Sequence, residues 1–251
     1  MISVKSIREI ELMRSAGKIT GETLQLLAES IKPGITTYEL DEIAEKYIRK
    51  CGAVPSFKNY GGFPKSICAS VNDEVIHGIP SKNRELVEGD IISFDIGACY
   101  KGYHGDAART EGVGKISDEA QKLIDVTKQS FFEGVAFAKA GHRVSDISVA
   151  VQKYAESFGY GVVRDYVGHG IGSNLHEAPE VPNFADLSRG RGARLVAGMT
   201  LAIEPMINMG DYRVKVLDDD WTVKTLDGCL SAHYENTVLI TNGEPEILTL
   251  L

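Results

Sequence analysis

The chain has 251 residues, enough for one large domain or two small ones. Its 35 acidic and 27 basic residues give a formal net charge of -8, which argues against a stable nucleic-acid partner because an acidic surface repels phosphate. Lys5, Arg8, Glu9 and Glu11 interrupt the N-terminus before an apolar core could form, so we expect no signal peptide, and no apolar run approaches the ~20 residues of a membrane span. With four cysteines and no C-x-x-C pair, we expect a reduced, cytoplasmic protein.

The first half of the chain predicts two helices followed by a strand. Ser6 with Glu9, and Thr36 with Glu39, have capping-box spacing, in which side chains satisfy free backbone groups at a helix start. The second helical pattern ends at Gly52, a residue type that often terminates helices. The apolar run at 86–95 then predicts a buried strand.

The second half of the chain repeats this order, with Ser117 and Ser145 predicted as helix N-caps. Two offsets relate the helical segments and the strands, 107 residues for 32–52 with 139–159 and 109 residues for 86–95 with 195–204. A third match, 104–106 with 233–235, has an offset of 129 and therefore implies about twenty extra residues near 211–227.

The repeat indicates the fold. We predict one α+β domain over residues 1–251, internally duplicated with pseudo-twofold symmetry. Few long crossovers separate the strands, so we expect an antiparallel sheet with the helices on one face.

Four carboxylates occupy matching places in the two halves, because the offsets set Asp95 against Glu204 and Asp106 against Glu235. A tight hairpin that turns at Tyr100-Lys101 would place Asp95 directly opposite Asp106 on the neighbouring strand. Like charges next to apolar strands are costly unless they are neutralised. Two divalent cations ~3.5–4 Å apart would balance the four charges.

The glycine-rich segment Gly168-His169-Gly170-Ile171-Gly172 contributes a histidine. Glycine there permits positive φ and close backbone approach, and neutral imidazole is a common metal ligand. A solvent-exposed glycine turn is the alternative interpretation. A dinucleotide-binding loop is a poorer one, because the G-x-G-x-x-G pattern fails at Ser173.

Together these motifs resemble type I methionine aminopeptidases over nearly the whole chain. The resemblance rests on the pair Asp95 and Asp106 and on Lys65-Ser66-Ile67-Cys68, His77-Gly78-Ile79-Pro80, Gly168-His169-Gly170-Ile171-Gly172, Ile203-Glu204-Pro205-Met206 and Glu235-Asn236-Thr237. It implies the "pita-bread" fold, which is the duplicated α+β arrangement predicted above.

The resemblance also implies a dinuclear metal site made of five residues. Asp95 would chelate one ion, Asp106 and Glu235 would bridge both, and His169 and Glu204 would complete the second ion's ligands. This mainly oxygen ligand set suits manganese, iron(II), cobalt or zinc, and it leaves the choice among them open.

The expected activity is removal of N-terminal methionine from nascent polypeptides, as at the ribosome, mainly when the second residue is small. Glu204 would also shuttle protons, His176 would donate to the scissile carbonyl oxygen, and His77 would contact the scissile amide nitrogen. We expect a monomer without membrane attachment.

An apolar pocket should hold the methionine side chain. Its expected residues are Tyr60, Phe63, Cys68 and Trp221, although Trp221 is equally consistent with an ordinary hairpin aromatic. The chain departs from the commonest family pattern at three positions that bear on the width of this pocket, Phe57, Gly61 and Leu175.

Three alternatives stay open. An X-Pro aminopeptidase or prolidase of the same fold would differ in substrate preference. A non-catalytic pita-bread module would bind peptides without cleaving them. A structural divalent-ion site would unfold the protein on chelation.

Overall fold

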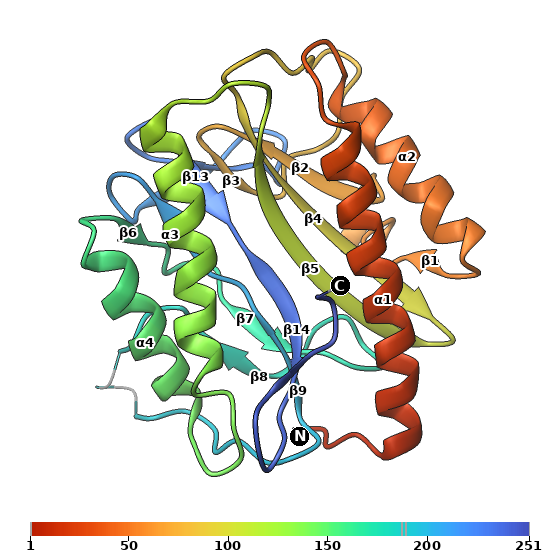
Figure 1. Ribbon diagram of the computed structural model, residues 1–251, viewed down its shortest axis with the longest axis vertical. Helices are drawn as coiled ribbons and strands as arrows, with labels where there is room; N and C mark the ends of the chain where they lie inside the picture. The colour runs from red at the N-terminus through yellow and green to blue at the C-terminus, as the bar shows by residue number, and fades with distance from the viewer. Residues whose placement is uncertain (1, 187, 189, 251) are drawn as a thin grey trace.

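The helices form two pairs in front of a central sheet. A computed structural model describes residues 2–186, 188 and 190–250, and in these residues the α-helices are α1 (Ile7–Ser30), α2 (Thr37–Lys50), α3 (Asp118–Val135) and α4 (Val144–Glu156). Figure 1 shows α1 with α2 on one side and α3 with α4 on the other, all covering one face. None of the described helices is both long and apolar enough to cross a membrane.

The helix starts follow the predicted capping with one exception. The capping boxes of Ser6 with Glu9 and of Thr36 with Glu39 are present, and the Ser117 side chain accepts from the Ala120 backbone N–H. The prediction for Ser145 was wrong, because Arg143 is the N-cap of α4 and its backbone N–H donates to Asp146 Oδ2 at 2.9 Å.

Short strands build three sheets within the described residues. Their bounds are β1 (Val54–Pro55), β2 (Ile67–Val71), β3 (Glu74–Ile76), β4 (Ile91–Tyr100), β5 (Tyr103–Gly112), β6 (Gly161–Val162), β7 (Gly168–Gly170), β8 (Glu177–Val181), β9 (Thr200–Ile203), β10 (Met206–Asn208), β11 (Val214–Val216), β12 (Val223–Thr225), β13 (Ser231–His233), β14 (Glu235–Leu239) and β15 (Glu246–Ile247). The 3₁₀ turn Tyr60–Gly62 lies between β1 and β2.

The central sheet shows the duplication directly. Its order is β1-β4-β5-β14-β9-β7-β8, with β2 beside β4 and β15 beside β14, and all the described strand pairs in it are antiparallel. The hairpin β4–β5 from the first half therefore meets the pair β9–β14 from the second half, and β5 lies next to β14 (Figure 1). This arrangement is the predicted duplicated α+β fold.

Both predicted apolar runs form strands only in their second parts. Gly89 and Gly198, which match in the repeat, have φ of 95° and 92° and lie in turns. The strands then begin at Ile91 and Thr200. A positive φ is accessible to glycine at little cost, so each repeat uses its glycine to turn the chain into the sheet.

The predicted hairpin register was wrong by two residues. Lys101 and Gly102, with φ of 50° and 83°, form the turn, so Tyr100 pairs with Tyr103. Two consecutive positive φ values are typical of the tight turns that join antiparallel strands. Glycine is the preferred residue at the second of these positions. Asp106 consequently lies opposite Gly97 rather than opposite Asp95.

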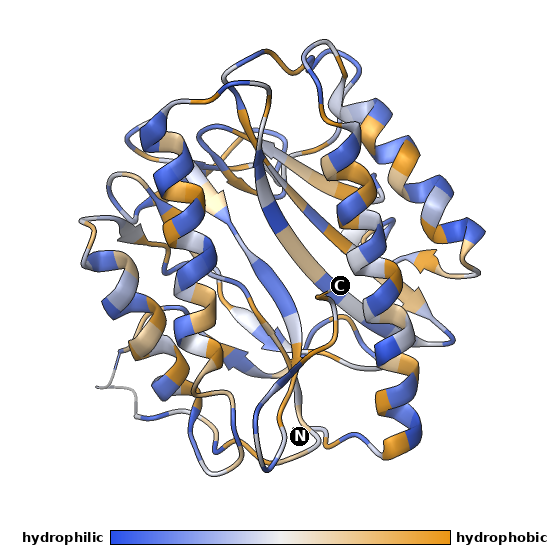
Figure 2. Cartoon of the chain, in the orientation of Figure 1, coloured by the Kyte–Doolittle hydropathy of each residue, from blue (hydrophilic) through white to orange (hydrophobic). Residues whose placement is uncertain are grey.

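Successive side chains of β4 point alternately to the core beneath the helices and to the other face of the sheet. Ile92, Phe94 and Ile96 pack in the apolar cluster beneath α1 and α2, so Asp95 points away from the helices. A second cluster, which includes Phe131 of α3 and Leu201 of β9, fills the space beneath α3 and α4. The mixed colouring of all four helices in Figure 2 fits this one-sided burial.

The extra residues of the second half form a separate hairpin. Strands β11 and β12 pair with each other, and β12 also pairs with β3, which precedes His77. The insertion therefore builds a small sheet beside the central one and places Trp221 near His77, with ring centroids 6.3 Å apart.

Candidate metal centre

A cavity of about 180 Å³ brings the predicted site residues together. It lies on the face of β4 that carries Asp95, opposite the helices. Its lining contains all the residues predicted for metal, substrate and pocket: Phe57, Tyr60, Gly61, Phe63, Cys68, His77, Asp95, Asp106, His169, Leu175, His176, Glu204, Trp221 and Glu235.

Four strands of the central sheet supply the four carboxylates. Asp95 lies on β4 and Asp106 on β5, while Glu204 directly follows β9 and Glu235 begins β14. The halves are joined at this point, because the Thr237 hydroxyl accepts from the Asp106 backbone N–H and donates to its carbonyl, at 3.0 and 2.9 Å. Each carboxylate is therefore held by sheet backbone.

His169 faces the carboxylates with one ring nitrogen. Its Nδ1 donates to the Gly170 carbonyl at 2.8 Å, which leaves Nε2 directed at Glu204 Oε1 and Asp106 Oδ2, at 3.7 and 3.9 Å. A metal-ligating histidine usually has its other nitrogen held in this way. The alternative of an exposed turn is wrong, since His169 is 8% exposed.

The glycines around His169 act through close approach and not through positive φ. They lie in strand β7, and a Cβ on Gly168 would come within 2.3 Å of the Ala202 carbonyl oxygen. A Cβ on Gly170 would come equally close to the carbonyl oxygen of Ala178. The missing side chains let β7 press against its neighbours and so fix the position of His169.

Burial makes this cluster of carboxylates electrostatically costly. Burial raises the pKa of Asp95 to about 7, and it raises the pKa values of Asp106, Glu204 and Glu235 well above their usual range. Repulsion among the carboxylates raises these last three further. Burial lowers the pKa of His169 to about 3, so its imidazole is neutral at physiological pH.

Unpaired buried atoms in the cluster fit divalent cations. Within the described part of the chain, Asp95 Oδ1, Asp106 Oδ1 and Glu235 Oε1 are buried and have no hydrogen-bond partner. Two groups of donor atoms lie within 4.8 Å of one another, Asp106–His169–Glu235 and Glu204–His233–Glu235. Oxygen and imidazole donors gathered without protein partners suit metal ions of the manganese-to-zinc class.

His233 belongs to this centre although the sequence argument treated it only as part of the repeat. It is 1% exposed, and its Nε2 lies 3.8 Å from Glu204 Oε2 and 3.9 Å from Glu235 Oε2. The signal that could have found it is its spacing, because residues two apart in extended chain face the same side, and Glu235 was already a candidate.

Two further histidines line the cavity. His176 Nδ1 lies 2.8 Å from the Tyr60 hydroxyl, and its ring centroid is 4.2 Å from that of His169. His77 follows β3 with φ of 60°, an unusual backbone conformation for a non-glycine residue, of the kind that concentrates at functional sites. Burial lowers the pKa of His77 to about 4 and also lowers that of His176.

Apolar side chains form the wall next to the histidines. The rings of Phe63 and Trp221 meet edge to face at 5.1 Å, and Cys68 is paired directly across from Asp95. Phe57 and Leu175 are buried in the same apolar cluster. Gly61 has φ of 57°, and its missing side chain leaves room in front of Trp221.

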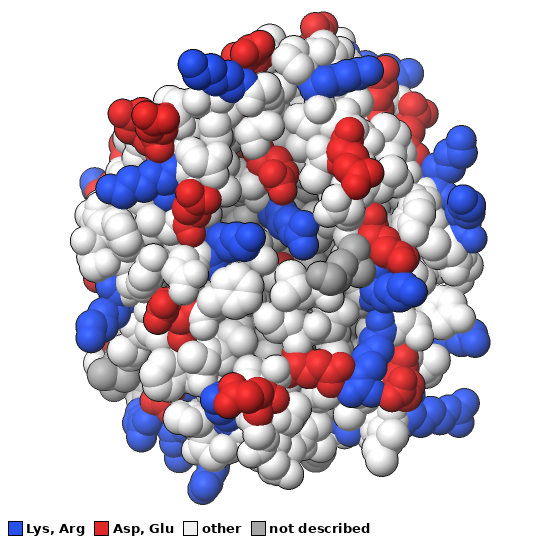
Figure 3. All heavy atoms as spheres, in the orientation of Figure 1, with Lys and Arg blue, Asp and Glu red and all other residues white. Residues whose placement is uncertain are grey.

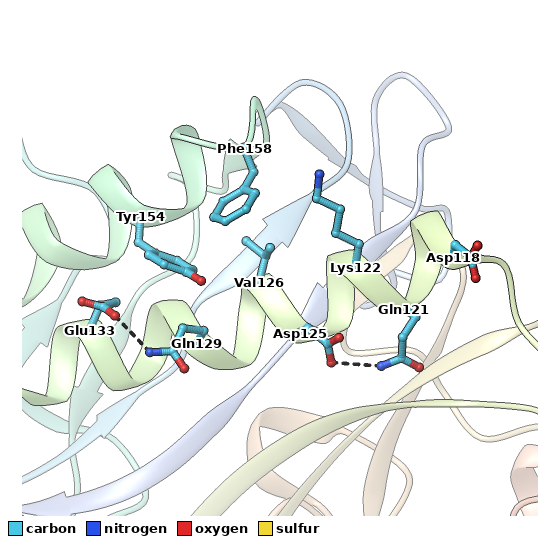
Figure 4. A pocket seen from close by; sticks show the side chains of 9 residues that line it. All are labelled: Asp118, Gln121, Lys122, Asp125, Val126, Gln129, Glu133, Tyr154 and Phe158. Carbon is cyan, nitrogen blue, oxygen red and sulfur yellow. Dashed lines mark hydrogen bonds between the residues drawn. The ribbon is translucent and has the colours of Figure 1, made fainter.

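A larger hollow between α3 and α4 lacks comparable chemistry. It has a volume of about 590 Å³ and contains Lys122, Tyr154 and Phe158 (Figure 4). Its polar side chains are paired along the helix surface, as Gln121 with Asp125 and Gln129 with Glu133. The hollow is therefore a solvated helix surface, whereas the smaller cavity holds buried, unpaired donors.

Known proteins with similar sequences and folds agree with this assignment. A model of metallopeptidase family M24 matches residues 11–242. The chain is 63% identical over 250 residues to a methionine aminopeptidase of Clostridium acetobutylicum, covering 100% of this chain and 99% of the relative. It is 53% identical to methionine aminopeptidase 1 of Bacillus subtilis, covering 99% of each chain.

Solved structures show the same fold. Methionine aminopeptidase from Thermotoga maritima matches with a TM-score of 0.97 at 44% identity and covers 100% of both chains. Prolidase from Pyrococcus furiosus matches with a TM-score of 0.81 at 23% identity and is covered over 65% of its length, which supports the fold alone. On the family match and these full-length identities, the chain belongs to metallopeptidase family M24.

Proposed function

We propose that the chain is a methionine aminopeptidase that removes N-terminal methionine from polypeptides, mainly when the second residue is small. The observation that carries the proposal is an apolar pocket that opens directly onto the buried carboxylate cluster. The full-length relatives named as methionine aminopeptidases support it at 44–63% identity.

The proposed centre holds two divalent ions, which are manganese, iron(II), cobalt or zinc. Asp95, Asp106, His169, Glu204 and Glu235 are the side chains that would hold these ions, and all five line the cavity. Bound divalent ions activate water and polarise the scissile carbonyl. Their charge would also offset the repulsion that raises the carboxylate pKa values in their absence.

Other side chains around the metal centre are assigned the remaining catalytic roles. The Tyr60 hydroxyl lies 2.8 Å from His176 Nδ1; a proton donated by this hydroxyl would leave the ring's own proton on Nε2, which could then donate to the carbonyl oxygen. His77, which lies beside Trp221 in the cavity lining, would contact the scissile amide nitrogen. Glu204 takes up and returns the proton during cleavage.

We also propose cytoplasmic action on nascent polypeptide N-termini at the ribosome, by a monomer with no stable nucleic-acid partner. The four cysteines, all free thiols, support a reducing compartment. Acidic and basic side chains are interspersed over the face shown in Figure 3, which offers no continuous basic field for a phosphate backbone. Sedimentation velocity tests the monomer, and a dimer at micromolar concentration would refute it.

The deciding experiment compares two peptides with the metal-loaded protein. We expect free methionine from Met-Ala-Ser and little cleavage of an X-Pro peptide, together with two metal equivalents by elemental analysis. Preference for the X-Pro peptide would favour a prolidase-type enzyme instead. Metal binding without cleavage of either peptide would favour a non-catalytic module.

A further inference from the structure

His233 is a buried histidine whose ring has no partner. Among the residues that the structure describes, neither Nδ1 nor Nε2 makes a hydrogen bond, and the residue is 1% exposed. A buried ring nitrogen without a hydrogen-bond partner destabilises the fold, so two such atoms on one ring require an explanation. An ordinary core histidine would have at least one of these nitrogens paired.

The backbone of His233 fixes where the ring points. Its N–H donates to Thr110 Oγ1 at 2.8 Å, and the same hydroxyl donates back to the His233 carbonyl at 2.9 Å. The residue also pairs with Met206 across β13 and β10. The ring thus projects from a backbone held on both sides, and its Nε2 is directed at the carboxylates of Glu204 and Glu235.

Glu204 lies between two imidazoles. Its Oε1 is 3.7 Å from His169 Nε2, and its Oε2 is 3.8 Å from His233 Nε2. Glu235 belongs to both groups of candidate donor atoms, whereas Glu204 belongs to one of them. Glu204 therefore has one oxygen on the side of His169 and one that is free for a hydrogen bond.

The two histidines also differ in a way that separates a ligand from a supporting residue. His169 has its Nδ1 held by the Gly170 carbonyl, the arrangement that orients a metal ligand. His233 lacks such a partner in the described chain. The difference favours His169 as the ligand and His233 as a hydrogen-bond donor to a ligand.

We propose that His233 is a positioning residue that donates its Nε2–H to Glu204 Oε2. This bond holds the Glu204 carboxylate so that Oε1 faces the metal position next to His169. The proposal requires that the present 3.8 Å separation between His233 Nε2 and Glu204 Oε2 shorten to hydrogen-bond length when metal is bound. The inference rests on the metal centre of the proposed function.

The test compares His233→Gln, which keeps an N–H donor, with His233→Leu, which removes it. The readouts are manganese affinity by titration calorimetry, the visible spectrum of the cobalt(II) form and the melting temperature of the metal-free protein. His142→Leu is the matched control, because His142 is exposed on the surface and faces Asp146.

We expect His233→Leu to weaken manganese binding by about 10–100-fold and to lower kcat with little change in KM. His233→Gln should restore affinity to within about three-fold, with an unchanged cobalt spectrum, because an amide N–H also supports Glu204. The metal-free melting temperature should not fall in either variant, since no hydrogen bond to the described chain is lost.

Two results would overturn the inference. Unchanged metal affinity in His233→Leu would show that the ring does not act on the centre. Equal loss of metal by both variants, with an altered cobalt spectrum, would make His233 a direct ligand. If the parent protein itself bound no divalent metal, the proposed function would fail rather than the role of His233 within it.

Discussion

Asp106 illustrates how a single side chain serves two opposing purposes. It is 3% exposed, and burial together with the charges of Glu235 and Asp95 raises its pKa well above the usual range. The carboxylate is therefore unfavourable for the metal-free fold and useful for holding a cation.

Asp106→Asn separates these purposes because the amide keeps the shape and removes the charge. We expect activity on Met-Ala-Ser to fall at least 100-fold and the metal content to drop below that of the parent. The metal-free variant should melt a few degrees higher, since about 1 kcal/mol corresponds to roughly 2–4 °C in a chain of this size. Full activity, or a lower melting temperature without metal, would contradict this account.

The buried groups also predict how the stability of the metal-free protein depends on pH. Burial raises the pKa of Asp95 to about 7, so the native state binds protons that the unfolded chain has lost above about pH 5. The pKa values of Asp106, Glu204 and Glu235 are raised further above their usual range, so stability should fall as pH rises from about 6.5 to 8.5. Below about 6.5 the trend should flatten, because the unfolded chain then protonates His169 and His233, whose native pKa values are about 3, while the native carboxyl groups keep their protons.

Urea denaturation after chelation measures this profile. With saturating manganese the slope between about pH 6.5 and 8.5 should disappear, because the metal keeps the carboxylates charged in the native state. A metal-free profile that is flat or rising over this interval would contradict the assigned burial of the four carboxylates.

At the level of elements, helix α1 packs closely against β5 at Gly105, which has no side chain to separate them. A Cβ on Gly105 would lie 2.7–2.9 Å from backbone atoms of Ala16 and Gly17, and the Thr20 hydroxyl donates to the Gly105 carbonyl at 3.2 Å. Gly105 immediately precedes Asp106. The close approach of helix and strand therefore fixes the backbone beneath one of the proposed metal ligands.

Gly105→Ala should push α1 away from β5. We expect a loss of about 1–3 kcal/mol in the free energy of unfolding, measured in urea, with reduced metal affinity. Gly243→Ala is the control, because the nearest atom to its added Cβ, Thr241 Oγ1, is 4.0 Å away. Equal effects of the two substitutions would show that helix contact at Gly105 is unimportant.

The β11–β12 hairpin contributes a wall of the proposed methionine pocket through Trp221. Trp221→Ala should lower kcat/KM for Met-Ala-Ser about ten-fold or more. It should also reduce the ratio of kcat/KM for methionine over leucine at the first position. Metal content should be unchanged, because the ring contacts Phe63 and no proposed metal ligand. Val216→Ala, on an exposed position of the same hairpin, is the control.

Local signals in the sequence were sufficient for most of these elements. Capping boxes located the starts of α1 and α2, and the repeat located the strands that carry the carboxylates. The register of β4 and β5 needed the backbone of Lys101-Gly102, because a shift of the turn by one residue moves every cross-strand pair by two. The start of α4 depended on Asp146 accepting from Arg143, a competition that pattern alone does not decide.

The site residues were predictable from the sequence where the two halves of the repeat match. They were less predictable where a side-chain contact occurs in only one half. The repeat paired Asp95 with Glu204 and Asp106 with Glu235, and the structure places all four in one cavity. His233 corresponds to His104 in the repeat, yet His104 Nδ1 bonds to Ser56 whereas His233 faces Glu204. Equivalent sequence positions thus have different partners, which only the packed molecule reveals.

For the whole molecule, the apolar clusters beneath the helices are distinct from the cavity lined by the carboxylates. Chelation should therefore leave a folded protein that is inactive, with an unchanged far-ultraviolet circular dichroism spectrum. Metal should raise the melting temperature through binding to the native state and restore activity when it is added back. Unfolding on chelation would instead identify a structural ion site.

The position of β14 has a consequence for synthesis of the chain. This strand is made near the end of translation, yet it inserts between β5 and β9 and carries Glu235 into the middle of the sheet. An incomplete chain emerging during synthesis has Asp95, Asp106 and His169 but cannot yet close the cluster. Hydrolytic competence therefore requires β14, and a chain that ends before Glu235 should be inactive.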